Sequence, residues 1–222
     1  MWTNPFLIDL GGVARNPYHN VLLDTIKNYD WSKPNLQETY LDGSHDIWFP
    51  FYDGGYEPLG ISRKTDPADM MVVEMCKPLL GHISTAFPGW KFVKGELINC
   101  PPNTKQNTHI DPRLFHRFGH RIHIPLLTNA SSMLSIRDEG SDAMVDHHLF
   151  PFRMYTFNNL VLHHSYNAGD TMRIHLVVDI MPGDHWLILK NAGINLFDKC
   201  KDTVIDRESY LNIVLDQHVS RS

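Results

Sequence analysis

The sequence has few cysteines, the residues that crosslink many extracellular proteins, and no segment that would cross a membrane. Its 3 cysteines, Cys76, Cys100 and Cys200, are an odd number at wide spacing, which suits neither a disulfide framework nor a cysteine-rich zinc site. No stretch approaches 18 uninterrupted apolar residues, and residues 1–10 lack the basic and apolar regions of a secretory signal. We therefore expect a soluble, cytoplasmic protein without a membrane partner.

Runs of basic residues are also missing. The chain has 20 Lys and Arg against 25 Asp and Glu, a formal charge of -5, and no cluster that would follow a phosphate backbone. Nucleic acid is therefore not an expected partner. The 222 residues are 42% hydrophobic, enough for one globular domain with a sizeable core. The 14 histidines crowd between His109 and His175, where a metal site or a proton-handling pocket would use them.

The pattern of apolar residues changes from helical to β along the chain. A helical segment is expected over 66–87. Eight short strands then follow, separated by turn residues but by no helix, and this predicts a mainly β fold with flanking helices, in which the strands form a jelly roll. We expect a single domain with a flanking segment at 1–90, a core at 91–182 and a helical tail at 183–222. The predicted strands span 91–99, 106–110, 121–127, 133–137, 143–146, 153–157, 161–164 and 172–180.

Two of these strands carry an arginine and a histidine on one face. Arg121 and His123 point one way because side chains alternate along a strand, and Arg173 and His175 repeat the arrangement. Buried charge without a partner is expensive, so the pattern predicts an anion-binding interior. The alternative, in which these faces meet solvent as in many antiparallel sheets, stays open.

A possible metal site is formed by His109, Asp111 and a later histidine. His109 and Asp111 lie two apart on a predicted strand and so point the same way. Two histidines and one carboxylate on one face of an octahedron leave positions for a 2-oxoacid and O2 at a ferrous ion. The third ligand is His163 or His164, which face opposite ways because they are adjacent.

Together these residues resemble the aspartyl/asparaginyl β-hydroxylase family of 2-oxoglutarate oxygenases, which includes bacterial proline hydroxylases. The resemblance covers about 97–180. It is carried by His109-x-Asp111, by Arg121-x-His123-x-Pro125, by His163-x-x-Tyr166-Asn167 and by Arg173-Ile174-His175-Leu176-x-x-Asp179. Animal members lack the acidic ligand that Asp111 supplies here, so the likeness is closer to bacterial or viral-type members with a full triad.

The resemblance implies a double-stranded β-helix, the cupin-like jelly roll, with Fe(II) held by His109, Asp111 and His163, the histidine that fits the family's spacing. It further implies that Arg173 binds the far carboxylate of 2-oxoglutarate, and that Arg121 and His123 lie near the oxoacid or the substrate carboxylate. The implied reaction uses 2-oxoglutarate and O2 to hydroxylate a free amino acid such as proline, or Asp, Asn or Pro in a peptide or protein, with release of succinate.

Two other classes of function remain possible. A similar ligand set can hold zinc or manganese in a cupin-like hydrolase or isomerase, and a jelly roll can be a non-catalytic binding module. The position of Arg173 argues against the first. Other polar residues have simpler interpretations: Cys100 is expected to be a small buried hydrophobe, Asp179 to satisfy backbone groups, and His116, His120, His147 and His148 to lie in loops or at strand ends without a direct role.

Overall fold

The computed structural model describes residues 7–14, 17–31, 45–48, 67–111, 118–138 and 140–191. The helices in these ranges are α1 (Pro17–Asn28), α2 (Pro67–Ala86) and α4 (Gly183–Asn191). The strands are β1 (Ile8–Gly12), β2 (His45–Trp48), β3 (Trp90–Cys100), β4 (Thr104–Lys105), β5 (His120–Leu127), β6 (Ser132–Arg137), β7 (Met144–His147), β8 (Arg153–Thr156), β9 (His163–Asn167) and β10 (Arg173–Pro182).

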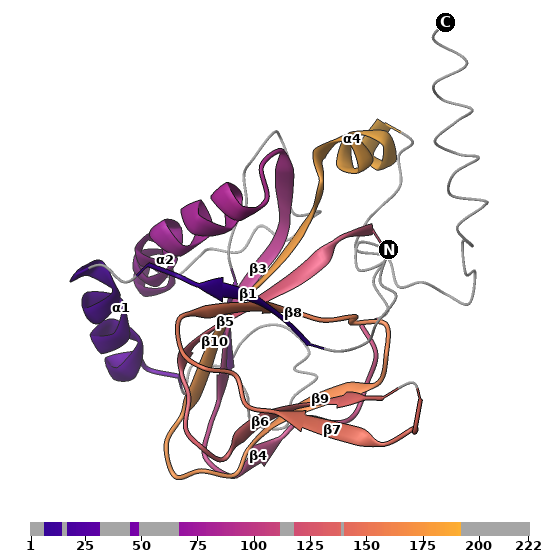
Figure 1. The fold of residues 1–222 in the computed structure, drawn as a ribbon. Coiled ribbons are helices and arrows are strands. Elements are labelled where there is room, and N and C mark those ends of the chain that lie inside the picture. Colours follow the sequence, from indigo (N-terminus) through magenta and orange to yellow (C-terminus); the bar gives the residue numbers. More distant parts are fainter. Residues whose placement is uncertain are drawn as a thin grey trace, which may run out of the picture.

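The strands form two antiparallel sheets, one of six strands in the order β1-β8-β5-β10-β3-β2 and one of four in the order β4-β9-β6-β7. From β3 to β10 the chain passes back and forth between them: β3, β5, β8 and β10 belong to the larger sheet, while β4, β6, β7 and β9 belong to the smaller. This order is the jelly roll, or double-stranded β-helix. Figure 1 shows the smaller sheet facing the larger one, and the predicted fold class is confirmed.

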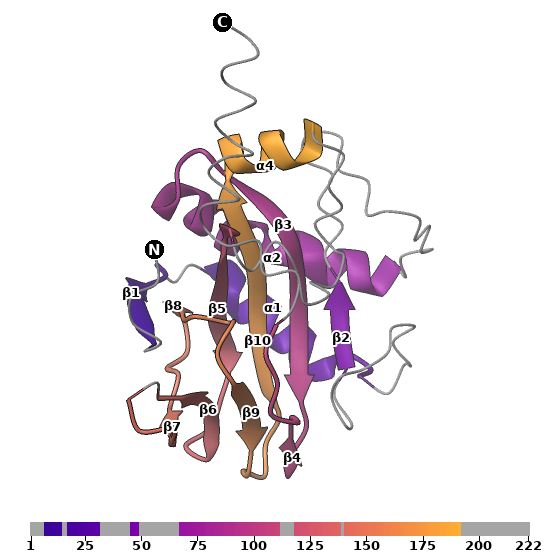
Figure 2. The same cartoon turned by 90° about the vertical axis from the view of Figure 1, so that its right-hand side faces the viewer.

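Alternation gives the larger sheet one apolar face and one polar face. The apolar face, with Leu97, Ile122 and Leu176, packs on Leu22 of α1 and Leu79 of α2, and all five side chains are fully buried. Figures 1 and 2 show α1 and α2 on this side, away from the smaller sheet. The core therefore lies between the helices and the larger sheet, which leaves the opposite face available for polar side chains.

Most predicted elements are confirmed to within a few residues, including the helix at 66–87, which continues past Pro78 to Ala86. The predicted strand at 106–110 is wrong. There β4 covers only Thr104–Lys105, and His109 makes a single isolated bridge to His163. Gln106 N donates to Ser165 O, but Ser165 N donates to the side chain of Gln106 instead of a backbone carbonyl, so this segment does not form a continuous ladder with β9.

The predicted helical tail begins with α4, but its part beyond residue 191 lies outside the described residues. Within the described helices, none combines the length and the apolar character needed to cross a membrane.

Candidate metal centre

Three side chains with metal-ligating atoms meet between the two sheets. His109 lies just after β4, and His163 begins β9. Two backbone hydrogen bonds join them, from His109 N to His163 O at 3.0 Å and from His163 N to His109 O at 2.9 Å. As a result, one ligand atom each of His109, Asp111 and His163 lies within 4.8 Å of the other two. The structure thus brings together the three residues that the sequence predicts.

Backbone carbonyls orient both imidazole rings. His109 Nδ1 donates to Asn107 O at 2.7 Å, and His163 Nδ1 donates to Val161 O at 2.9 Å. A carbonyl can only accept, so Nδ1 of each ring carries a proton, and in the neutral form of each ring Nε2 has the lone pair that binds a metal. The two Nε2 atoms lie 3.7 Å from the Asp111 carboxylate oxygens, farther than a hydrogen bond. Three acceptor groups that face one another in this way suit a divalent cation.

The imidazole of His163 is also kept neutral. Burial lowers its pKa to about 4, although the nearby Asp111 carboxylate opposes the shift. A neutral ring is the form that binds a metal. The neighbouring His164 faces the other way, where its Nδ1 lies 3.2 Å from Thr108 Oγ1. The structure therefore places His163, and not His164, beside His109 and Asp111.

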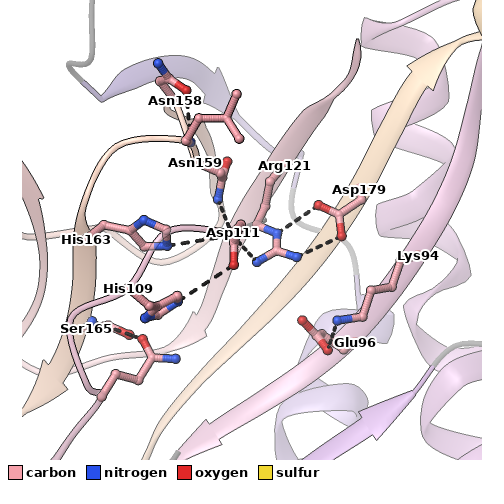
Figure 3. Close-up of polar contacts among 12 residues, drawn as sticks. Lys94, Glu96, His109, Asp111, Arg121, Asn158, Asn159, His163, Ser165 and Asp179 are labelled. Atoms are coloured by element: carbon pink, nitrogen blue, oxygen red, sulfur yellow. Dashed lines mark hydrogen bonds and ion pairs between the residues drawn. The ribbon is translucent and has the colours of Figure 1, made fainter. Parts of the chain in front are cut away.

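The carboxylate of Asp111 is held by two donors. Arg121 Nη1 donates to its Oδ2 at 2.6 Å, and Asn159 Nδ2 donates to the same oxygen at 2.9 Å. Arg121 in turn makes two hydrogen bonds to Asp179, from Nε at 2.8 Å and from Nη2 at 2.9 Å. Figure 3 shows the guanidinium of Arg121 between the two carboxylates. The expectation that Asp179 satisfies backbone groups overlooked this ion pair.

A small cavity of about 40 Å³ is lined by two of the three candidate ligands, His109 and His163, and Arg173 also lies in its wall. Arg173 is 4% exposed. Its Nη1 donates to Cys100 Sγ at 3.2 Å and its Nη2 to His175 Nδ1 at 3.0 Å, and none of the described residues offers it a carboxylate. The cavity is lined by Ile98, Gln106, His109, Arg121, His123, Leu134, His163, Ser165, Arg173, His175 and Val177.

Two histidines in this wall have polar atoms without hydrogen-bond partners among the described residues. These atoms are both ring nitrogens of His123 and Nε2 of His175. Because Arg173 can only donate, His175 Nδ1 accepts and His175 Nε2 carries a proton. Burial, and then the charges of Arg121 and Arg173, lower the pKa of His123 to about 3. The wall around Arg173 therefore combines this cation with neutral imidazole rings whose nitrogen atoms are available to hydrogen-bond to a ligand.

Two other residues of the family-like motifs have structural contacts. Asn167 is fully buried, and its Nδ2 donates to Cys100 O at 2.9 Å and to Thr171 O at 2.8 Å, which ties the end of β3 to the loop before β10. Tyr166 points outward and donates to Asp146 Oδ2 at 2.9 Å. Cys100 is buried, as predicted, but it also accepts a hydrogen bond from Arg173.

The remaining histidines lie apart from the ligands. His120 stacks on Trp90 with ring centroids 5.0 Å apart, and neither His147 nor His148 lines the cavity. His116 is outside the described residues. The sequence analysis missed Asn159 altogether. The only signal for it is a turn-forming Asn158-Asn159 pair shortly before His163, and a turn does not show which side chain it will meet.

Comparisons with known proteins bear on the fold. No family model and no curated protein matches the sequence. A prolyl hydroxylase from Trichoplax adhaerens, solved with a hypoxia inducible factor peptide, has a TM-score of 0.50 at 12% identity and covers 81% of this chain and 84% of that one. AviO1 from Streptomyces viridochromogenes Tue57 has a TM-score of 0.52 at 12% identity, over 80% of this chain and 90% of that one.

A 2OG-Fe(II) oxygenase family oxidoreductase from Burkholderia pseudomallei has a TM-score of 0.48 at 9% identity, over 72% of this chain and 77% of that one. At such low identity a likeness of this kind concerns the backbone alone. The backbones of the Trichoplax and Streptomyces structures resemble this chain over about four fifths of its length. The chain therefore has the double-stranded β-helix fold that these proteins share with it.

Proposed function

We propose that this chain is an Fe(II)- and 2-oxoglutarate-dependent dioxygenase that hydroxylates an amino-acid side chain. In this proposal His109, Asp111 and His163 hold the iron, and Arg173 binds the C5 carboxylate of 2-oxoglutarate. The substrate class, a free amino acid such as proline or an Asp, Asn or Pro in a peptide or protein, rests on the family-like motifs of the sequence. The products are succinate, CO2 and the hydroxylated substrate.

One observation supports this function most strongly: Arg173 is a buried cation to which none of the described residues offers a carboxylate, and it lines the same cavity as His109 and His163. Burying an unpaired ion costs several kcal/mol, a cost that a bound anion would offset. Its guanidinium can meet a carboxylate with two parallel hydrogen bonds. A 2-oxoacid with a second carboxylate suits this arrangement, because its oxoacid end chelates a metal and its other end would pair with Arg173.

The described side chains fit both groups. Two neutral imidazoles and one carboxylate are the 2-His-1-carboxylate set of non-haem Fe(II) oxygenases, and the iron supplies the activation of O2 that is coupled to decarboxylation of the oxoacid. Around it, His175 Nε2 offers a proton to the ligand near Arg173. Ile98, Leu134 and Val177 line the same cavity with apolar surface and so limit the entry of water.

The test is formation of succinate by the Fe(II)-loaded protein, followed by mass spectrometry as 2-oxoglutarate is varied. We expect Arg173→Ala to raise the 2-oxoglutarate concentration at half-maximal rate by about 10- to 150-fold, because hydrogen bonds to a charged group contribute about 1.5–3 kcal/mol each. The matched control is Arg137→Ala, since Arg137 is 40% exposed in its side chain and pairs with Asp142. An unchanged 2-oxoglutarate dependence in Arg173→Ala would remove Arg173 from this role.

Metal analysis of the purified protein tests the two alternative functions, a zinc- or manganese-dependent hydrolase or isomerase and a non-catalytic binding module. A protein that contains zinc or manganese and forms no succinate after loading with Fe(II) would be a cupin-like hydrolase or isomerase, and one that binds no metal would be a binding module. If succinate forms, a panel of free amino acids and peptides, screened for the mass gain of one oxygen atom, identifies the substrate.

A further inference from the structure

The metal carboxylate has one oxygen that is already occupied. Arg121 and Asn159 both donate to Asp111 Oδ2, at 2.6 and 2.9 Å. A carboxylate oxygen has about two in-plane acceptor sites, so these two bonds fill Oδ2. The bond from Arg121 is charge-assisted and short, which makes it the stronger of the two. His109 Nε2 lies 3.7 Å from Oδ1 and His163 Nε2 lies 3.7 Å from Oδ2, so both rings face a carboxylate whose orientation Arg121 and Asn159 fix.

Asp179 fixes the guanidinium of Arg121 in the orientation in which it donates to Asp111. The Asp179 carboxylate receives two parallel hydrogen bonds from Nε and Nη2 of Arg121. Asp179 is 2% exposed, and the two residues are direct neighbours in the register of β10 and β5. Turning the guanidinium away from Asp111 would break this buried pair, which is costly because both charges are removed from water. Figure 3 shows the resulting chain of contacts from Asp179 through Arg121 to Asp111.

We propose that Asp179 is a positioning residue for the metal centre: through Arg121, which donates to Oδ2 of Asp111, it fixes the orientation of that carboxylate, so that the carboxylate would bind the metal through a single oxygen. A carboxylate that binds through one oxygen uses one coordination position instead of two. The triad then leaves three positions of an octahedral ion open, as a chelating oxoacid and O2 require. This inference rests on the proposed metal site, but it depends on neither 2-oxoglutarate nor the identity of the substrate.

The test uses Asp179→Asn, with Glu96→Gln as the matched control. Glu96 is buried on the same face of the larger sheet, on β3, and its carboxylate pairs with Lys94 at 2.7 Å. Both variants remove one negative charge that acts on Arg121, but only Asp179→Asn removes a carboxylate that is hydrogen-bonded to it. Mn(II) affinity is measured by titration calorimetry without 2-oxoglutarate, and the absorption spectrum of the Co(II) form reports the coordination number.

We expect Asp179→Asn to weaken Mn(II) binding by about 10- to 100-fold, the usual effect of losing a residue that orients a ligand, and to change the Co(II) spectrum. Glu96→Gln should change the affinity by less than about 3-fold and leave the spectrum unchanged. Equal weakening in both variants would show a general effect of charge and would overturn the proposal. So would an unaltered affinity and spectrum in Asp179→Asn.

Arg121→Lys keeps the test decisive if Asp179→Asn does not fold. Lysine keeps the charge but cannot form the planar fork that joins two carboxylates, so it should weaken Mn(II) binding and change the Co(II) spectrum as well. Full Mn(II) affinity together with a weaker dependence on 2-oxoglutarate would assign Arg121 to the oxoacid and would overturn the proposal. Failure of the unaltered protein to bind Mn(II) would refute the metal site itself, whereas Mn(II) binding without succinate formation would refute only the proposed reaction.

Discussion

Adjacent histidines on β9 have different surroundings. His163 lies with its Nε2 facing Asp111, whereas His164 lies beside Thr108. We expect His163→Ala to abolish binding of Fe(II) and formation of succinate, because His109 and Asp111 alone are two ligands of three. His164→Ala should keep both, with at most a modest loss of stability. Metal content of the purified variants, with circular dichroism to check folding, gives the answer, and reversed phenotypes would move the third ligand to His164.

For single residues, the sequence predicts the side chains that would bind a ligand better than it predicts the residues that hold those side chains in place. His109, Asp111 and Arg173 could be predicted because their types and spacing have a chemical meaning of their own. Arg121 was expected near the oxoacid or the substrate; it does line the cavity, but the structure shows its hydrogen bonds going to Asp111 and Asp179. Which carboxylate meets a buried arginine depends on the register of three strands, and a register cannot be read from one sequence.

Side chains on the two faces of β5 have different roles, because successive residues of a strand point in opposite directions. Arg121 and His123 face the cavity, while Ile122 is fully buried against the helices on the other face. We expect Ile122→Ala to lower the free energy of unfolding by about 2–5 kcal/mol, because it leaves a cavity in a packed core. The protein that stays folded should bind Mn(II) with unchanged affinity.

Urea unfolding and calorimetry measure the two effects. Val145→Ala is the control, since Val145 is half-buried on β7 at the edge of the smaller sheet and should cost much less than Ile122→Ala. Weak Mn(II) binding by folded Ile122→Ala, without a loss of stability, would mean that Ile122 and not Arg121 faces the metal.

Whole elements were predicted where their apolar pattern is long. The helix α2 and the strands β3, β5 and β10 have such patterns, and all were found. The helix α1 was not predicted, because its buried stripe is only His19, Leu22 and Ile26, and a histidine at one of three positions hides the helical period. The strand predicted at 106–110 failed for a different reason: there the side chain of Gln106, instead of a backbone carbonyl, accepts from Ser165 N, which interrupts the ladder with β9.

Over the whole molecule, the two faces of the larger sheet differ in polarity: apolar side chains cover the face toward the helices, and ionisable side chains gather on the face toward the smaller sheet. The fully packed layer between the helices and the larger sheet supplies the burial that folding requires. The space between the two sheets holds ionisable groups, including Arg121, Asp179 and Arg173, to which none of the described residues offers a carboxylate. A smaller apolar cluster that includes Leu134 and Ile136 of β6 adds to the buried surface of the smaller sheet.

The buried histidines between the two sheets predict how the free energy of unfolding depends on pH. Burial is the main cause that lowers the pKa of His123 to about 3 and that of His163 to about 4, and it lowers the pKa of His175 well below its ordinary value of 6.5. The unfolded chain therefore binds more protons than the folded chain below pH 6.5, so stability falls as the pH is lowered from 6.5 toward 4. Each histidine contributes up to about 1.4 kcal/mol per pH unit in this window.

His123→Phe should reduce that dependence in the metal-free protein. Both ring nitrogens of His123 lack a hydrogen-bond partner among the described residues, and its ring packs against Phe157 with centroids 5.4 Å apart, so phenylalanine fits in size and loses no bond. The free energy of unfolding in urea is measured at several values between pH 6.5 and 4.5, above the range in which Asp9 and Asp146, whose pKa values are lowered from 3.8, lose their contribution. We expect a shallower slope for His123→Phe than for the unaltered protein. Equal slopes in the two proteins would show that His123 is protonated in the folded state within this pH range, and the wall around Arg173 would then be more cationic than the structure indicates.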